Sequence, residues 1–238
     1  MSVGYDDYYK DDIEAKWREL GAASKVDNIV ALGEGVPHGT ILEVGAGEGA
    51  VLKELSMRGF GRELYALEVS RSGVEAIARK EIPTLIKAEL FDGAVIPYED
   101  QSFDLAILCH VVEHLDNPRS LIREALRVAR HVVVEVPLED NCRLRKDYAP
   151  DRVGHINHYN ARTIRYLLQT CGAEVLAQTT TNAKRAAYEY KYGRSGAFRH
   201  FVKGAMLRAL PRLATRLWTY NCALVVRKGP WVVYSDDR

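Results

Sequence analysis

A short apolar run that ends in alternating glycines, ILEVGAGEG at residues 41–49, constrains this chain more than any other segment. Its β-prone residues suit a strand that is buried on both faces: Ile41, Leu42 and Val44. Its glycines let the backbone turn sharply and approach a ligand closely: Gly45, Gly47 and Gly49. A helical pattern begins around Glu48, so free amide groups at a helix N-terminus face whatever the loop holds. A strand, a glycine loop and a helix in this order predict a cradle for a nucleotide-type cofactor.

The composition is that of a globular protein with one domain and its attachments. The chain has 238 residues, of which 47% are hydrophobic and 27% charged. No apolar run approaches the roughly 20 residues that cross a bilayer, and the acidic N-terminus lacks the apolar region of a secretory signal. The four cysteines are scattered without a C-x-x-C pair. This pattern predicts reduced thiols in a cytoplasmic protein rather than a disulfide framework or a zinc ribbon.

The net charge of +1 conceals an asymmetry. Residues 183–228 hold eleven Lys or Arg against one acid, Glu189, so this segment carries +10 and the rest of the chain −9. A basic segment on an otherwise acidic protein predicts either an anionic partner or a solvated face.

Apolar runs alternate with helix-period segments, which predicts an α/β fold with a doubly wound, mostly parallel sheet covered on both faces. Seven strands are expected, at Thr40–Val44, Glu63–Glu68, Thr84–Lys87, Phe103–Cys109, His131–Val136, Glu174–Thr180 and Asn221–Arg227. Helices are expected at Asp11–Leu20, Glu48–Met57, Ser72–Ala78, Pro118–Ala129 and Ala161–Thr170. The single domain divides into a helical lead-in or lid (1–39), a cofactor-binding core (40–182), a basic helical insertion (183–218), and the last strand and tail (219–238).

The glycine loop alone does not select its cofactor. The G-x-G-x-x-A spacing of residues 45–50 also fits a dinucleotide fingerprint, and Glu68 closes the second strand where a ribose-binding acid belongs. NAD and S-adenosylmethionine therefore both remain open at the loop. Three features separate them: Glu43 before the first glycine together with the G-x-G-x-G spacing, Glu89 at the end of the third strand, and IPYEDQSFDLAILCHVVEHLDNP at 96–118.

These segments resemble the class I S-adenosylmethionine-dependent methyltransferases, in particular the group that includes ubiquinone- and menaquinone-type enzymes. ILEVGAGEG resembles their first motif, LYALEVS their second strand with its ribose-binding acid, and LIKAEL the strand that carries an acid at the adenine. SFDLAILCHVVEHLDNPRSLIREALRV resembles their fourth strand, Glu-His loop and following helix. The resemblance covers residues 40–136 and, more loosely, GHINHYNARTIRYLLQTCGAEV at 154–175. The chain departs from it in lacking a Lys-Pro-Gly-Gly turn before the fifth strand and in carrying Glu89 for the usual Asp.

The resemblance implies a Rossmann-like fold with an antiparallel last strand, and S-adenosyl-L-methionine as the cofactor. It implies that residues at the ends of the first four strands bind this cofactor: Glu43, Gly45, Ala46, Gly47, Gly49, Glu68, Val69, Glu89, Leu90 and Cys109. The chemistry agrees with this assignment, because ribose hydroxyls need a carboxylate acceptor, which Glu68 would supply bidentately.

Residues 110–114, His-Val-Val-Glu-His, spell the H-x-x-E-H pattern of inverzincin metalloproteases. Zinc binding by this pattern needs both histidines on one helical face and a third ligand further along the chain. Here the motif follows a strand directly, and Asn117-Pro118 starts a new helix, so little room remains for the required helix. We therefore expect loop histidines and no metal, with Glu113 or His114 in structural hydrogen bonds, an interpretation preferred for His114.

Methyl transfer is an in-line displacement at a sulfonium, so positioning supplies much of the rate, while a hydroxyl or ammonium acceptor must also lose a proton to a base. Histidine suits the base because its ordinary pKa lies near neutrality. The candidates are His110, just after the fourth strand, and His155 or His158 in the loop before Ala161. The resemblance favours His155, because an analogous loop in the family often carries a histidine that faces the acceptor. The alternative for each is an ordinary polar loop residue.

Aromatic residues occur in two further places. The first group lies ahead of the core and consists of Tyr5, Tyr8, Tyr9 and Trp17. These residues predict either a lid over the bound cofactor or a helix packed on the sheet. Those in the insertion recur at every second position and are candidates for lining an acceptor pocket: Tyr188, Tyr190 and Tyr192.

The insertion contains an apolar stripe at helical spacing, which Pro211 should kink or divide. The stripe consists of Phe198, Phe201, Val202, Ala205, Met206, Ala209, Leu210, Leu213, Ala214 and Leu217. Basic residues lie off the stripe, at Arg199, Lys203, Arg208, Arg212 and Arg216. The favoured interpretation is a helix that packs on the body with its basic residues solvated. The other is a surface that meets an anionic lipid headgroup or a phosphorylated acceptor.

The sequence therefore predicts a cytoplasmic methyltransferase that uses S-adenosyl-L-methionine on a small-molecule, sugar-type or lipid-linked acceptor, with O-methylation favoured over N-methylation. The basic insertion adds a peripheral contact with an anionic membrane as a further hypothesis. Two other classes remain open: a nucleic-acid methyltransferase that uses residues 183–228, and an NAD-dependent oxidoreductase. Nucleic acid is the less favoured partner, because the charge is confined to one segment and no RNA-binding module is evident.

Overall fold

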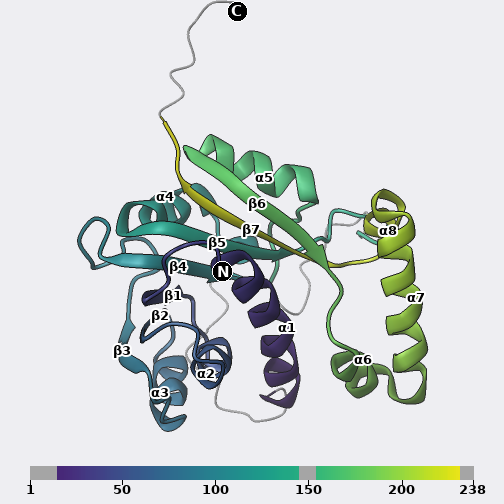
Figure 1. Ribbon diagram of the computed structural model, residues 1–238, viewed down its shortest axis with the longest axis horizontal. Coiled ribbons are helices and arrows are strands. Elements are labelled where there is room, and N and C mark those ends of the chain that lie inside the picture. The colour runs from purple at the N-terminus through teal and green to yellow at the C-terminus, as the bar shows by residue number, and fades with distance from the viewer. Residues whose placement is uncertain (1–14, 145–153, 231–238) are drawn as a thin grey trace, which may run out of the picture.

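A computed structural model describes residues 15–144 and 154–230 of the chain. Its centre is a seven-stranded sheet with the strand order β3-β2-β1-β4-β5-β7-β6 (Figure 1). The strands are β1 (Thr40–Val44), β2 (Glu63–Glu68), β3 (Leu85–Leu90), β4 (Phe103–Cys109), β5 (Ala129–Pro137), β6 (Ala173–Thr181) and β7 (Asn221–Lys228). β7 is antiparallel to both of its neighbours, and the other described pairs are parallel. The predicted fold class, with its antiparallel last strand, is confirmed.

Helices cover both faces of this sheet (Figure 1). α1 (Ala15–Gly33), α2 (Ala50–Met57) and α3 (Arg71–Arg79) lie on one face, and α4 (Pro118–Val128) and α5 (Ala161–Thr170) lie on the other. α6 (Arg185–Tyr192), α7 (Gly196–Ala209) and α8 (Pro211–Leu217) stand together at one end of the molecule (Figure 1). Among the described residues, no helix combines the length and the hydropathy that a bilayer span requires.

The core consists of two apolar layers, one on each face of the sheet. Successive side chains of a strand point to opposite faces, so Leu42 and Val44 pack with α4 and α5, whereas Ile41 packs with α1 and α2. Because helices cover both faces, the central strands are buried on both sides, and β4 is almost continuously apolar. This continuous apolar signal explains why the central strands could be read directly from the sequence.

The predicted elements lie within two residues of the observed bounds, with two exceptions. The predicted helix Asp11–Leu20 is wrong at its C-terminal end, because α1 continues to Gly33. The buried residues Ala22, Val26 and Ile29 recur four and three positions apart, which is the helical signal that identifies this continuation. Residues 11–14 lie outside the described part of the chain. The predicted strand Thr84–Lys87 ends too early, because β3 continues to Leu90. This edge strand is half exposed, so its sequence lacks the continuous apolar run that marks the central strands.

The insertion is helical and divides at Pro211, as predicted, since this proline begins α8. The favoured interpretation, a helix packed on the body with its basic residues solvated, is confirmed only in part. Ala214 of the stripe is buried and the arginines off the stripe are exposed, but Phe198 and Phe201 are exposed on α7 as well. The inner side of α7 is attached by polar contacts instead. Lys203 Nζ donates to the Thr219 carbonyl at 2.7 Å, and Tyr220 Oη donates to the Lys203 carbonyl at 2.9 Å.

Candidate functional site

The glycine loop joins β1 to α2 through a left-handed backbone. Gly45, Gly47 and Gly49 have φ angles of 74°, 57° and 77°, a region that side chains disfavour. The amides of Gly45 and Ala46 donate to the Leu67 carbonyl at 2.8 and 3.1 Å, which fixes the loop to the end of β2. A Cβ on Gly45 would lie 2.6 Å from Val111 Cγ2. Glycine at this position therefore lets the loop after β1 pack closely on the loop after β4.

A cavity of about 300 Å³ opens beside this loop, at the carboxyl edge of the sheet. Ligands of open α/β folds bind at this edge, and the volume is that of a small-molecule site. Five of the residues predicted to bind cofactor line the cavity: Glu43, Gly45, Ala46, Gly47 and Cys109. The remaining wall includes Trp17, Arg18 and Lys25 from α1, and Ala183 and Ala187 from the insertion. Both segments that flank the core therefore contribute to the wall of the cavity.

Glu43 presents a buried carboxyl group to this cavity. Its side chain is 2% exposed, and its Oε2 atom has no hydrogen-bond partner among the described residues. Burial raises the pKa of Glu43 to about 8, although the charge of Lys25 acts in the opposite direction. An unsatisfied carboxyl oxygen is costly unless something pairs with it. The group that best compensates it is a cation such as an ammonium.

Glu68 holds the glycine loop in place. Its Oε2 atom accepts from the Gly47 amide at 2.8 Å, and its Oε1 atom accepts from the Ser70 amide at 3.0 Å. Each carboxylate oxygen can accept a second hydrogen bond, so ribose hydroxyls could still bind here. Its direct contact with ribose stays a prediction, whereas its contact with the loop is observed.

Apolar side chains are exposed where β2 and β3 end. Val69 and Leu90 are 42% and 50% exposed, and Glu68 is the register partner of Leu90 in the neighbouring strand. Val69 and Leu90 together offer an apolar surface to a flat ring. Glu89 lies beside it, where its carboxylate accepts from Tyr98 Oη at 2.6 Å and pairs with Lys87 Nζ at 2.8 Å. These two contacts hold the pKa of Glu89 below its usual value in spite of partial burial.

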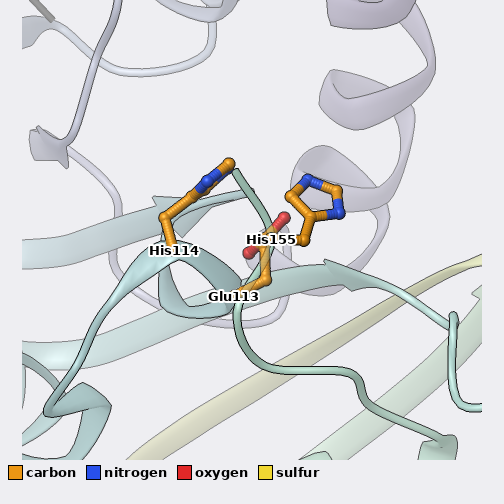
Figure 2. Close-up of side chains that lie close together, drawn as sticks. All are labelled: Glu113, His114 and His155. Carbon is orange, nitrogen blue, oxygen red and sulfur yellow. The ribbon is translucent and has the colours of Figure 1, made fainter. Parts of the chain in front are cut away.

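A second cluster forms around Glu113, in the loop after β4 (Figure 2). The carboxylate of Glu113 points between the imidazole rings of His114 and His155 (Figure 2). Glu113 is fully buried, and neither of its oxygens has a hydrogen-bond partner among the described residues. Burial raises the pKa of Glu113 to about 7. A proton on this carboxyl group is therefore exchangeable near neutral pH.

Glu139 links two of the predicted catalytic histidines. Its Oε2 atom lies 2.6 Å from His155 Nδ1 and 3.7 Å from His158 Nδ1. Because a carboxylate accepts, the Nδ1 atom of His155 carries the proton in this contact. The tertiary structure thus orients His155 more firmly than His158.

The third candidate, His110, lies between two buried acids at the cavity wall. Its Nδ1 atom is 3.4 Å from Glu113 Oε1, and its Nε2 atom is 3.3 Å from Glu135 Oε1. Its backbone is left-handed, with φ of 59°, which is uncommon for a residue with a side chain. Burial lowers the pKa of His110 well below its usual value, and the charge of His155 acts in the same direction. The three predicted histidines are therefore brought together around Glu113 and Glu139.

The same cluster bears on the metalloprotease pattern. The helix that H-x-x-E-H needs does not form, because Val112–His114 is a single 3-10 turn and α4 begins at Pro118. Tertiary folding nevertheless brings ligand atoms of Glu113, His114 and His155 within 4.8 Å of one another. Two histidines and a carboxylate are a common donor set for divalent metals. These residues could hold an ion, and the prediction that the protein works without a metal stays a prediction.

Several site residues were not predicted from the sequence. Arg18, Lys25 and Asn28 belong to α1, whose full length was missed. Asn28 Nδ2 donates to Glu135 Oε2 at 2.7 Å, and burial raises the pKa of Glu135 to about 7. Glu135 interrupts the apolar run of residues 132–137 within β5, and an acid in such a run is the signal that could have identified it.

The aromatic residues take different places from those expected. Trp17 lines the cavity, which agrees with a covering role, whereas Tyr5, Tyr8 and Tyr9 lie outside the described residues. The tyrosines of the insertion belong to a helix rather than a strand, so Tyr188 and Tyr192 share a face and Tyr190 lies on another. None of these three lines the cavity, although the ring of Tyr190 stacks on that of Trp17 with 6.5 Å between their centroids.

The sheet with its antiparallel β7, the glycine loop and the cavity at the carboxyl edge define a class I S-adenosylmethionine-dependent methyltransferase. A family model described as a methyltransferase domain matches residues 15–178, and the chain belongs to this family. The cofactor is therefore S-adenosyl-L-methionine, and the oxidoreductase alternative falls away. Membership in the ubiquinone-type group stays a prediction.

Two curated proteins are similar to parts of this chain. An uncharacterised Methanocaldococcus jannaschii protein, MJ1123, is 26% identical over 52% of this chain and 55% of its own. The Bacillus subtilis protein YrhH, named as a methyltransferase, is 30% identical over 37% of this chain and 50% of its own. The matches thus span about half the length of these curated relatives.

The solved structures are more distant in sequence. A chain in the complex of the Haloferax volcanii Trm112 methyltransferase activator and its methyltransferase has a TM-score of 0.70 at 15% identity, covering 95% of this chain and 98% of that one. A SAM dependent methyltransferase from Aquifex aeolicus has a TM-score of 0.56 at 19% identity, covering 93% and 97%. At these identities the likeness concerns the fold alone.

Proposed function

We propose that the protein methylates a hydroxyl group of a small-molecule, sugar-type or lipid-linked acceptor, with His155 as the general base. The observation that carries this proposal is the 2.6 Å contact between His155 Nδ1 and Glu139 Oε2. A carboxylate at Nδ1 directs the basic lone pair to Nε2 and stabilises the imidazolium that forms when the ring takes a proton. The same arrangement makes Glu139 a positioning residue.

The cavity fits the charged end of the cofactor. Glu43 offers a buried, unsatisfied oxygen to an ammonium group, and the loop of Gly45–Gly47 offers backbone polar groups to a carboxylate. Val69 and Leu90 offer apolar surface to the adenine ring. When bound, S-adenosyl-L-methionine supplies a methyl group on a positively charged sulfur that leaves as a neutral thioether.

The remaining groups position the acceptor and exclude water. His110 lines the cavity, and its low pKa keeps the ring neutral, so it suits a hydrogen bond to the acceptor better than uptake of a proton. Trp17 of α1 and Ala187 of α6 line the cavity, and these two helices would limit solvent access during the reaction.

O-methylation is favoured over N-methylation because of the base. An alcohol holds its proton tightly, so its attack on a methyl group gains most from a carboxylate-backed histidine. An amine that arrives as an ammonium loses its proton before the transfer and then attacks with a free lone pair, so it gains less from a base at the moment of transfer. The Glu139–His155 pair is therefore best explained by a hydroxyl acceptor.

The test is transfer of a labelled methyl group from S-adenosyl-L-methionine to paired acceptors: a phenol, a hexose glycoside and a polyprenyl-linked sugar, each beside its amine counterpart. We expect label on a hydroxyl compound, and we expect His155→Ala to lower kcat by about 100-fold or more. Glu139→Gln should lower kcat less and shift the acidic limb of the pH profile, where a general base becomes protonated, while the affinity for S-adenosylhomocysteine stays unchanged. Preferential labelling of amines, or a full rate in His155→Ala across the pH range, would contradict the proposal.

A further inference from the structure

α7 and α8 stand at one end of the molecule (Figure 1), and large apolar side chains in this region are exposed to solvent. Phe198 and Phe201 are 70% and 69% exposed, and Leu210 and Leu213 are 52% and 44% exposed. Residues three apart lie on one face of a helix, so the two phenylalanines form a continuous outward stripe on α7. These four residues, together with the arginines described next, are called the α7–α8 surface.

The α7–α8 surface is strongly basic as well as apolar. Residues 190–230 contain no Asp or Glu. Five exposed arginines lie among or beside the apolar residues: Arg194, Arg199, Arg208, Arg212 and Arg216. Arg199 packs over the Tyr192 ring at 4.8 Å, and none of the five has a carboxylate within 4.0 Å in the part of the chain that the structure describes. Their positive charge is therefore not neutralised by neighbouring acids of the fold.

Ring contacts and hydrogen bonds attach this surface to the core. His200 of α7 packs edge-on against Tyr188 of α6 at 5.5 Å, and Ala187, beside Tyr188, lines the cavity. Lys203 and Tyr220 tie the inner side of α7 to the start of β7 through two hydrogen bonds. A partner that binds the α7–α8 surface thus fixes the orientation of the whole domain, with the cavity one helix away.

We propose that the α7–α8 surface docks on an anionic lipid bilayer. Phenylalanine and leucine side chains are stabilised in the boundary between headgroups and acyl chains, and arginines beside them pair with anionic headgroups. Both requirements are met on the same two helices. A nucleic acid backbone would use the arginines but would leave Leu210 and Leu213 without a favourable environment. Docking needs neither cofactor nor methyl transfer, so it holds or fails independently of the acceptor.

The test is co-sedimentation of the full chain with vesicles of phosphatidylcholine alone or of phosphatidylcholine and phosphatidylglycerol in equal parts. We expect binding to the anionic vesicles at low salt and a loss of most binding at about 500 mM salt, where charges are screened. Phe198→Ser/Phe201→Ser should reduce binding by about tenfold or more, because both apolar anchors are lost. The matched control is Met57→Ser/Ile86→Ser, which removes two residues of similar exposure, 73% and 56%, from α2 and β3.

Circular dichroism melting of both double variants confirms that each remains folded. Three results would overturn the proposal. The first is no binding of the wild-type chain to anionic vesicles at low salt. The second is equal loss of binding in the Met57/Ile86 control, or none in the Phe198/Phe201 variant. The third is release of the vesicle-bound protein by polyuridylate, together with RNA binding that the phenylalanine substitutions do not change, which would identify a nucleic-acid surface.

Discussion

Replacement of Glu43 by glutamine removes a buried carboxyl group while it keeps the size and shape of the side chain. In the folded protein the pKa of Glu43 is about 8, because burial disfavours its charged form, whereas its ordinary value is 4.5. Between these two pH values the folded chain holds a proton that the unfolded chain has released. The free energy of unfolding therefore falls as the pH rises through this range. Glutamine has no proton to lose, so Glu43→Gln lacks this contribution.

The magnitude follows from the two pKa values. Each pH unit of difference corresponds to about 1.4 kcal/mol, so a folded-state pKa of about 8 against 4.5 gives at most about 5 kcal/mol. Side-chain relaxation and water entry around the charged group lower this cost, and about 2–5 kcal/mol is expected. The difference in unfolding free energy between Glu43→Gln and wild type should therefore rise by about 2–5 kcal/mol, in favour of the variant, between about pH 5 and about pH 9.

Urea denaturation followed by circular dichroism measures this difference at each pH. Glu113 and Glu135, whose pKa values are about 7, titrate in both proteins, so their contributions cancel in the comparison. Glu63→Gln removes a carboxylate from an exposed position at the start of β2 and controls for net charge. A difference between Glu43→Gln and wild type that stays constant from about pH 5 to about pH 9 would refute the reasoning.

The same substitution tests the contact of Glu43 with the cofactor. If the ammonium of S-adenosylhomocysteine pairs with the Glu43 carboxylate, binding near pH 7 must release the proton that the buried group holds. Calorimetric titration in two buffers of different ionisation enthalpy should detect up to about one released proton for wild type and none from this site in Glu43→Gln. The variant should also bind about tenfold more weakly or worse. Equal proton release in both proteins would exclude this role for Glu43.

Three further predictions follow from other parts of the structure. Gly45→Ala places a Cβ 2.6 Å from Val111 Cγ2 at a residue whose φ is 74°. The substitution should lower the free energy of unfolding by about 1–3 kcal/mol and also weaken the binding of S-adenosylhomocysteine. Calorimetry that shows wild-type affinity would contradict this prediction. Asn160→Ala removes the capping box of α5 and should cost about 1 kcal/mol in urea denaturation without changing that affinity. Dialysis against EDTA should leave the rate of methyl transfer unchanged. If EDTA instead abolishes the activity and added Zn²⁺ restores it, Glu113, His114 and His155 are assigned as metal ligands.

The sequence by itself determined the α/β architecture and the cofactor loop. Strands such as Phe103–Cys109 are buried on both faces, so burial leaves a continuous apolar run that can be read without knowing the partners of the strand. The glycines at 45, 47 and 49 report a local backbone requirement, a positive φ, which is also encoded locally. Features that depend on local geometry or on uniform burial were therefore predictable, and the edge strand β3 and the length of α1 were less so.

Only the tertiary structure decided how the distant residues combine. Glu139 and His155 are 16 positions apart, and nothing in the local sequence of either residue specifies the 2.6 Å contact between them. The stripe on α7 was visible as a pattern, but a pattern does not state which side of a helix meets the core. The hydrogen bonds of Lys203 and Tyr220 attach the polar side and leave Phe198 and Phe201 in solvent. Periodicity is a property of one segment, whereas packing depends on the surfaces that the other segments present to it.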